Sequence, residues 1–441
     1  MADVKTSINW LGRTFGKSRD TKVWRGRAAS VAGVMLAVAC CGSAPTYADG
    51  AGTNWIRFGG RPVDTVAAQS YDRSFVRRWE KNPPRGYPTL AKDNIAATRK
   101  AIKRYAAIVE DGGWEDVPEK AQIELGVTHP AVLALQKRLT ATGELRGAAS
   151  NYFDFATEKA LKRFQATHGL TPTGRLDDRT RKALNVSAKI RLRQLRTNLS
   201  RLRRHAVSDK GRYVVVNIPA AQIEAVEKGR VYSRHTGVVG KLDRKTPILR
   251  SRIHELNFNP VWRLPPTVVT KDLIPKGRQM ARAEQNVLVK YGIDAYAGGR
   301  KLDPEKVRWN SSHPYKLRYR QKPGEDNPLG FVKINFHNAH SVYLHDTPSD
   351  RLFGRNFRAA SSGCVRVSNV EKLVAWLLRD KDMGLRDVER FKKTGETKTV
   401  RLKRSIPIKL VYVTAWATED GQVQFRRDLY RRDGVGSRAM Y

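Results

Sequence analysis

The sequence predicts a multidomain α+β protein, helical in its first half and mainly β in its second. At 441 residues the chain is long enough for two or three domains, and 40% hydrophobic with 28% charged residues is a globular composition. Apolar residues recur at helical spacing within residues 128–204. The period then changes to that of strands, in the runs 213–219 and 231–240. We therefore expect helical domains followed by a β-rich domain.

The segment 1–48 has the pattern of a secretory signal peptide. Basic residues precede an apolar run from Val31 to Ala39, and Ala48 offers a small residue for cleavage. The run is shorter than the roughly 20 apolar residues that a membrane-spanning helix needs. We expect export to the periplasm. Two alternatives stay open: an uncleaved signal anchor and lipidation at Cys40, either of which would keep the protein on the membrane.

The formal net charge of the chain is +41. The first 48 residues carry seven basic and two acidic groups, so removing their +5 leaves +36. Export argues against nucleic acid as the partner, and no recognition helix or aromatic-studded single-strand module stands out. Anionic polymers of the cell envelope are the expected partners of such a charge. The alternative is a solvated basic face that only aids solubility.

The region 49–127 is predicted to be a helical scaffold, with one helix from Leu90 to Glu110. It is followed by three short amphipathic helices within 128–187. This second region contains the motifs Leu133–Leu139, Ala160–Gln165, Gly169-Leu170 and Thr173-Gly174. With them it resembles the peptidoglycan-binding-like domain of wall enzymes. The alternative is a structural bundle without a ligand of its own.

A connecting helix is predicted at 188–207, because leucines form one stripe among the arginines of 190–204. We expect it to pack on a domain; a helix lying on a membrane surface is the alternative. The region 208–441 is predicted to be mainly β. Further strands are expected at 330–336, 341–345 and 406–417, and a helix at 370–378.

A polar, basic insertion interrupts the β domain at about 265–327, with a partial helical pattern over 281–291. Long insertions in compact domains are often functional. We therefore expect it to form a lid or cap.

Cys364 is the one cysteine that would survive removal of the signal, since Cys40 and Cys41 lie within it. His345 precedes Cys364 by nineteen residues. An imidazole that accepts the thiol proton, or forms a thiolate–imidazolium pair, turns a cysteine into an acyl-transfer nucleophile. The two residues alone are also compatible with a buried thiol and an unrelated structural histidine.

Residues around Cys364 can complete such a site. Gly363 permits a tight turn, and the main-chain amides of Gly363 and Cys364 can hold an oxyanion. Arg366 shares the side of Cys364 in an extended chain and can bind a carboxylate with two hydrogen bonds. Tyr343, on the face of His345, and Ser362 are further candidate substrate contacts. No metal or cofactor is predicted, because no His/Cys/carboxylate cluster has ligand spacing.

The β-rich region contains the motifs Tyr343–Pro348, Ser361–Val367 and Gly330–Ile334, supported by Asn257–Trp262, Leu264–Pro266 and Phe425–Tyr430. With these motifs it resembles the catalytic domain of the L,D-transpeptidases (YkuD type), in their large Gram-negative form with a capping insertion. Together the motifs span most of the chain after Arg212. The order of signal, helical module and catalytic domain is also that of the family.

The resemblance implies peptidoglycan biosynthesis, and with it a part in cell shape. Cys364 would attack the carbonyl of the third residue of a tetrapeptide stem and expel D-alanine. The resulting thioester would pass to the side-chain amine of a second stem, which cross-links two third-position diamino acids. His345 is implied as the general base, oriented by a main-chain carbonyl, whereas Asp346 points to the other side of the strand and is a doubtful partner.

Two departures from the family pattern are Ser362, where many relatives have histidine, and His337, where proline is common. His337 is therefore an alternative base. Three alternative functions also stay open: an L,D-carboxypeptidase that uses water as the acceptor, a thiol enzyme that attaches or detaches a lipoprotein, and a non-catalytic wall-binding scaffold.

Overall fold

A computed structural model describes residues 78–79, 81–118, 123–207 and 211–441. The predicted signal peptide and the start of the scaffold region lie outside these residues. In the described part of the chain, no helix combines the length and apolar character needed to cross a membrane.

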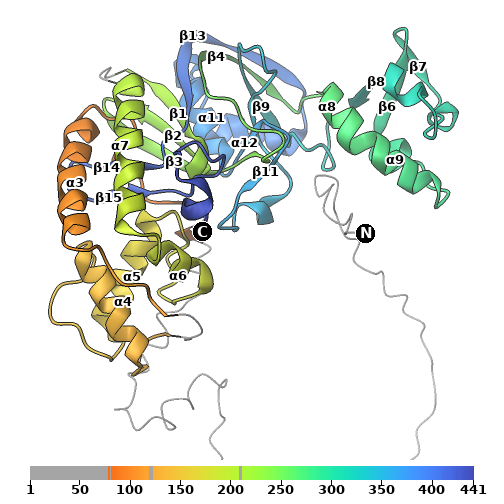
Figure 1. The fold of residues 1–441 in the computed structure, drawn as a ribbon. Helices are drawn as coiled ribbons and strands as arrows, with labels where there is room; N and C mark the ends of the chain where they lie inside the picture. Colours follow the sequence, from red (N-terminus) through yellow and green to blue (C-terminus); the bar gives the residue numbers. More distant parts are fainter. Residues whose placement is uncertain (1–77, 80, 119–122, 208–210) are drawn as a thin grey trace, which may run out of the picture.

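Two long helices form one side of the molecule. Helix α3 (Asp93–Glu110) packs beside α7 (Ala188–His205), and both cover the small sheet of β14 (Ala415–Ala417) and β15 (Val423–Phe425) (Figure 1). Leu192 and Leu195 of α7 are buried there. The predicted connecting helix therefore packs on the C-terminal region.

The helical module consists of α4 (Pro130–Ala141), α5 (Phe155–Thr167) and α6 (Asp178–Leu184). Asp154 and Asp177 cap α5 and α6 by accepting main-chain N–H groups of Thr157 and Thr180. The predicted apolar stripes close a separate core of buried residues, which include Val132, Leu135, Leu139, Ala160, Leu161 and Phe164.

A nine-stranded sheet dominates the C-terminal domain. Its order is β11 (Ala359–Ser361), β3 (Arg230–Gly240), β12 (Val365–Val367), β10 (Leu344–His345), β9 (Val332–Phe336), β4 (Leu249–Phe258), β13 (Lys398–Val411), β1 (Tyr213–Asn217) and β2 (Gln222–Glu227). Because β2 also pairs with β3, eight of these strands close into a ring, as in a barrel. Helices α11 (Val370–Leu378) and α12 (Leu385–Thr394) pack with the sheet into its main apolar core.

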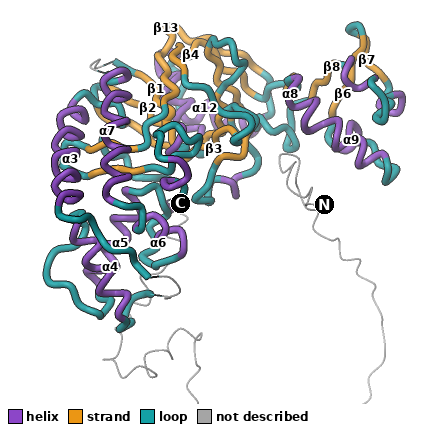
Figure 2. The backbone as a smooth tube through the Cα atoms, viewed as in Figure 1, coloured by secondary structure: helices purple, strands orange, loops and turns teal. Residues whose placement is uncertain are grey.

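The insertion forms a lobe that projects from this sheet (Figures 1 and 2). Its helical part comprises α8 (Pro266–Val268), a π-helical turn (Val269–Leu273), α9 (Ile274–Ala281) and α10 (Val287–Lys290). Its sheet comprises β5 (Trp262–Arg263), β8 (Arg318–Gln321), β6 (Ile293–Ala297) and β7 (Arg300–Leu302). A core of its own holds the lobe together. We call residues 262–329 the cap.

Local side-chain hydrogen bonds shift two predicted elements. The helical pattern over 281–291 is interrupted, because the Asn286 side chain caps a new helix, α10. The strand predicted at 341–345 shortens to β10. Asn338 hydrogen bonds with the main chain of Val342, and Ser341 has a φ of 52°, so a turn replaces the first half of the strand.

Candidate active site

Cys364 and His345 are brought together by two neighbouring parallel strands. In the register of β10 and β12, Leu344 lies opposite Val365 and His345 lies opposite Arg366. Leu344 and Val365 point into the main core. Side chains alternate along strands, so Tyr343, His345, Cys364 and Arg366 share the other face.

These four side chains and Ser362 line one cavity of about 350 Å³ between the sheet and the cap. The cap contributes Trp262, Val268 and Asp272 to its wall. Tyr343 also packs against the apolar core of the cap. The predicted site residues thus converge on a space that the cap helps to enclose.

The turn before Cys364 requires glycine. Gly363 has a φ of 120°, which side-chain-bearing residues rarely adopt. Its amide donates to Ser361 Oγ over 3.2 Å, and Ser361 Oγ in turn donates to the Cys364 carbonyl over 2.5 Å. Of the two amides predicted to hold an oxyanion, that of Gly363 is therefore already engaged, which leaves that of Cys364.

His345 is buried and held by its neighbour's main chain. Its Nδ1 lies 2.6 Å from the Asp346 carbonyl oxygen, which can only accept, so Nδ1 carries the proton. Burial and the positive charge of Arg366 lower the pKa of His345 to about 3, although the carbonyls of Asp346 and Pro328 act against this shift. At neutral pH the imidazole is therefore neutral, and Nε2 is the nitrogen available to take a proton.

The Asp346 carboxylate takes no part in orienting His345. It accepts the Phe331 amide over 3.0 Å, in the space left by the missing side chain of Gly330. Burial raises the pKa of Asp346 to about 6. This carboxylate has a structural position, as its place on the strand predicts.

Cys364 rests as a thiol. Burial raises its pKa, while hydrogen bonding from Tyr343 and the positive charges of Lys333 and Arg366 act in the opposite direction. A thiol beside a neutral imidazole favours the first of the two predicted modes, transfer of the proton to His345, over a preformed ion pair.

Arg366 is a buried cation without a carboxylate partner in the described part of the chain. Only 6% of its surface is exposed, its Nε has no partner, and its Nη1 lies 3.4 Å from Thr347 Oγ1. Burial lowers its pKa to about 10. A desolvated guanidinium in a cavity wall is suited to receive an anion.

Three further residues belong to this site and are not singled out by the sequence. Lys333 lies opposite His345 on β9, with Nζ 4.4 Å from the Tyr343 ring centroid. Arg244 donates to the Ser362 hydroxyl over 2.8 Å and pairs with Asp272 of the cap. Lys333 could have been found from the sequence, because the alternation of β9 places its side chain on the same face as His345 once the two strands pair. No local pattern marks the Arg244–Asp272 pair.

His337, the alternative base, stands outside this cavity. It is exposed and stacks on His254, with ring centroids 4.0 Å apart. Within the described residues, no group of three or more His, Cys, Asp or Glu side chains is arranged to hold a metal ion.

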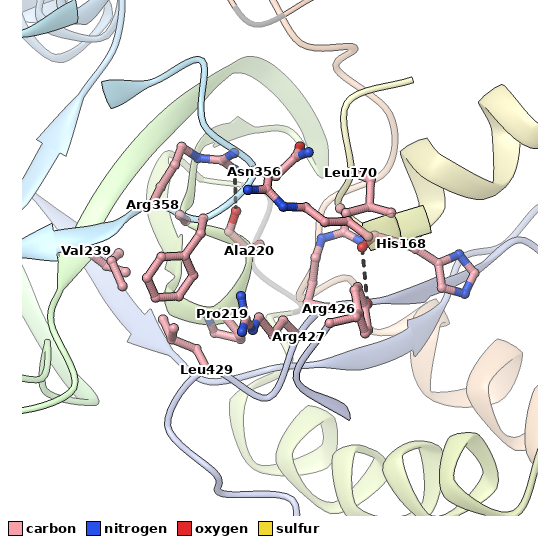
Figure 3. A pocket seen from close by; sticks show the side chains of 16 residues that line it. His168, Leu170, Pro219, Ala220, Val239, Asn356, Arg358, Arg426, Arg427 and Leu429 are labelled. Atoms are coloured by element: carbon pink, nitrogen blue, oxygen red, sulfur yellow. Dashed lines mark hydrogen bonds between the residues drawn. The ribbon is translucent and has the colours of Figure 1, made fainter. Parts of the chain in front are cut away.

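A second pocket lies where the helical module meets the C-terminal domain (Figure 3). Arg426 reaches across this junction and donates to the Thr167 carbonyl at the end of α5 over 2.7 Å. Asn356 Oδ1 accepts from the amide and hydroxyl of Thr171. Arg358 donates to the Ala220 carbonyl over 3.0 Å (Figure 3). Hydrogen bonds therefore fix the module against the C-terminal domain.

Comparison with known proteins identifies two domains in the chain. Residues 211–400 match the L,D-transpeptidase catalytic domain YkuD, and residues 128–184 match the "Putative peptidoglycan binding domain". Residues 211–400 thus carry a catalytic domain of the L,D-transpeptidase YkuD type, in a chain whose residues 128–184 match a module of the peptidoglycan-binding type.

A "Putative L,D-transpeptidase" of Haemophilus influenzae is 30% identical over 256 residues, which are 58% of this chain and 50% of that protein. The chain thus spans about half the length of this relative.

Solved structures of two L,D-transpeptidases also align with the chain. That from Xylanimonas cellulosilytica (residues 123–326) is 17% identical over 67% of this chain and 99% of its own, with a TM-score of 0.23. That from Stackebrandtia nassauensis is 12% identical over 67% and 96%, with a TM-score of 0.26.

Proposed function

We propose that this protein is a peptidoglycan L,D-transpeptidase that cross-links third-position diamino acids through a thioester on Cys364. The observation that carries the proposal is the shared cavity of Cys364 and a neutral His345 whose Nδ1 is fixed by a main-chain carbonyl. The family match of residues 211–400 supports it.

In the first step, His345 Nε2 takes the thiol proton as Sγ bonds to the carbonyl of the third stem residue. The Cys364 amide stabilises the oxyanion of the tetrahedral intermediate. The intermediate then collapses, the carbon–nitrogen bond breaks, and the imidazolium returns its proton to the leaving amine. D-Alanine departs, and the thioester remains.

In the second step, the side-chain amine of another stem attacks the thioester. His345 removes a proton from this amine, the new amide forms, and Sγ leaves and regains a proton. We propose that Arg366 binds the terminal carboxylate of the donor stem, since its buried guanidinium has an unsatisfied Nε and pairs with no carboxylate among the described residues. Tyr343 and Ser362 line the same cavity as substrate contacts.

Incubation of the purified protein with tetrapeptide-bearing wall fragments tests this proposal. Intact-mass analysis should reveal an acyl adduct on Cys364, and digestion should reveal cross-links between third residues. Cys364→Ala should abolish both while wall pull-down persists. Tripeptide products alone would indicate a carboxypeptidase, and stem–lysine conjugates a lipoprotein-linking enzyme. Cross-linking that survives Cys364→Ala would overturn the proposal.

We further propose that the protein is exported to the periplasm and that its helical module holds it near the wall. The basic and apolar pattern of residues 1–48 supports export, and the match of residues 128–184 supports wall binding. Anionic envelope polymers would add loose attraction to its positive charge. Cell fractionation with N-terminal sequencing tests export, and a cytoplasmic, uncleaved protein would contradict it.

A further inference from the structure

An ion pair joins the cap to the loop between β3 and β4. Arg244 Nη1 lies 2.5 Å from Asp272 Oδ2, and its Nη2 lies 2.9 Å from Asp272 Oδ1. The Arg244 side chain is 7% exposed and that of Asp272 is 2% exposed. A buried ion pair with two hydrogen bonds has a narrow range of favourable geometries. It therefore depends closely on the relative position of the cap and the β3–β4 loop.

The same guanidinium reaches the turn that carries the nucleophile. Arg244 Nη1 donates to Ser362 Oγ over 2.8 Å, two residues before Cys364. Asp272 itself lies in the π-helical turn of the cap, a rare helix form that occurs frequently at functional sites. Arg244 thus contacts both the cap, through Asp272, and the turn that carries Cys364, through Ser362.

A second contact holds this turn without the cap. Thr246 Oγ1 donates to the Gly363 carbonyl over 2.8 Å, and the Thr246 amide donates to the Tyr430 hydroxyl over 3.1 Å. Tyr430 belongs to the main core of the catalytic domain. The cysteine turn is therefore held by Thr246 within the sheet domain and is linked to the cap through Arg244.

We propose that Arg244 is a positioning residue that couples the seating of the cap to the placement of Cys364. With the cap in place, Asp272 fixes the guanidinium, and the guanidinium fixes Ser362 and the turn. When the cap moves away, Arg244 loses the two-pronged Asp272 contact, although Asp243 of its own loop stays 3.4 Å from Nε, and the turn keeps its contacts within the sheet domain, that of Thr246 among them. The coupling deepens the proposed acyl transfer, on which its catalytic consequence rests.

Three variants and a matched control test the coupling. Asp272→Asn keeps the shape of the cap residue and removes its charge, Arg244→Lys removes the two-pronged geometry, and Ser362→Ala removes the contact with the turn. Arg379→Gln is the control, because it breaks an ion pair with Glu227 on a part of the domain away from the cavity. Thermal unfolding identifies a temperature at which all the variants are folded.

Two rates are measured for each variant: alkylation of Cys364 by iodoacetamide, and single-turnover acylation by a tetrapeptide stem. A released turn exposes the thiol and lowers its raised pKa, so Asp272→Asn and Arg244→Lys should be alkylated about threefold faster at pH 8. The same variants should be acylated about tenfold more slowly at saturating stem, with stem affinity nearly unchanged, because the nucleophile is misplaced.

The double variant Asp272→Asn/Ser362→Ala should acylate no more slowly than the worse single variant, because both substitutions break one bridge. Alkylation rates in Asp272→Asn and Arg244→Lys that equal those of Arg379→Gln would overturn the coupling, as would fully multiplicative losses in the double variant. If the wild type forms no acyl adduct while the alkylation pattern holds, the proposed reaction fails and the coupling of cap and thiol stands.

Discussion

His345 and Arg366 lie opposite each other on adjacent parallel strands, which sets a permanent cation beside the imidazole. On the other side, Lys333 of β9 lies opposite the same histidine. An imidazolium formed during the reaction would therefore meet two positive neighbours and would be short-lived. This arrangement favours a base that returns its proton quickly over one that stores it.

The first prediction concerns the pH dependence of thiol reactivity. The pKa of His345 is lowered to about 3 and that of Cys364 is raised, so no ion pair should exist near neutrality. The rate of Cys364 alkylation by iodoacetamide should rise with pH beyond pH 9 without an earlier plateau. Mass spectrometry of samples quenched at successive times measures the alkylation rate at each pH. A plateau in this rate between about pH 5 and pH 8 would instead reveal a thiolate–imidazolium pair.

The second prediction concerns the donor carboxylate. Arg366→Gln should lower kcat/KM for a tetrapeptide donor about 10- to 100-fold, the size expected for charge-assisted hydrogen bonds. A stem whose terminal carboxylate is converted to an amide should react equally poorly with the wild type and with Arg366→Gln. A further loss with the amide in Arg366→Gln would show that Arg366 acts on something other than this carboxylate.

The third prediction concerns stability in acid. Burial lowers the pKa of His235 to about 4, although the Ser368 carbonyl opposes the shift. Below about pH 6.5 the unfolded chain binds a proton that the folded chain does not, so stability is lost as the pH falls toward 4. His235 should contribute about 2 kcal/mol of the loss in unfolding free energy between pH 7 and pH 5.

Urea unfolding of His235→Gln at both pH values measures this contribution. The loss between pH 7 and pH 5 should shrink in this variant, and it should be unchanged in His340→Gln, which alters an exposed histidine. Equal losses in the wild type and in His235→Gln would contradict the prediction.

The fourth prediction concerns the module junction. Gly169 has a φ of 71°, and an added Cβ would lie 2.7 Å from Arg426 Cδ. Gly143 has a φ of 83° in the same module, but nothing lies within 4 Å of its Cβ position. Gly143→Ala should cost about 1–2 kcal/mol of unfolding free energy from backbone strain alone.

Gly169→Ala should cost a further 1–3 kcal/mol or so, because Arg426 must also move. Thermal or urea unfolding of the two variants compares them directly. Equal costs would mean that Arg426 yields freely and that the junction is loose.

Periodic patterns predicted much of this fold, because they report on burial within one element. The leucine stripe of α7 and the alternation of β9 each depend on a single element. Once two strands pair, their alternation also places Tyr343, His345, Cys364 and Arg366 on one face. The length of β10 was not predictable, since it depends on the Asn338 side chain outcompeting a strand ladder. The pairing of Arg244 with Asp272 depends on how the cap is folded, and no local pattern encodes that.

The cap has its own apolar core, and a hydrogen bond from Asn327 Nδ2 to the Pro260 carbonyl over 2.9 Å ties its C-terminal end to the segment that leads into it. A segment with joined ends and independent packing can be lengthened, shortened or exchanged as a cassette without shifting the strand register beneath it. Evolution or engineering can therefore retune which molecules enter the cavity while the sulfur and imidazole stay where they are.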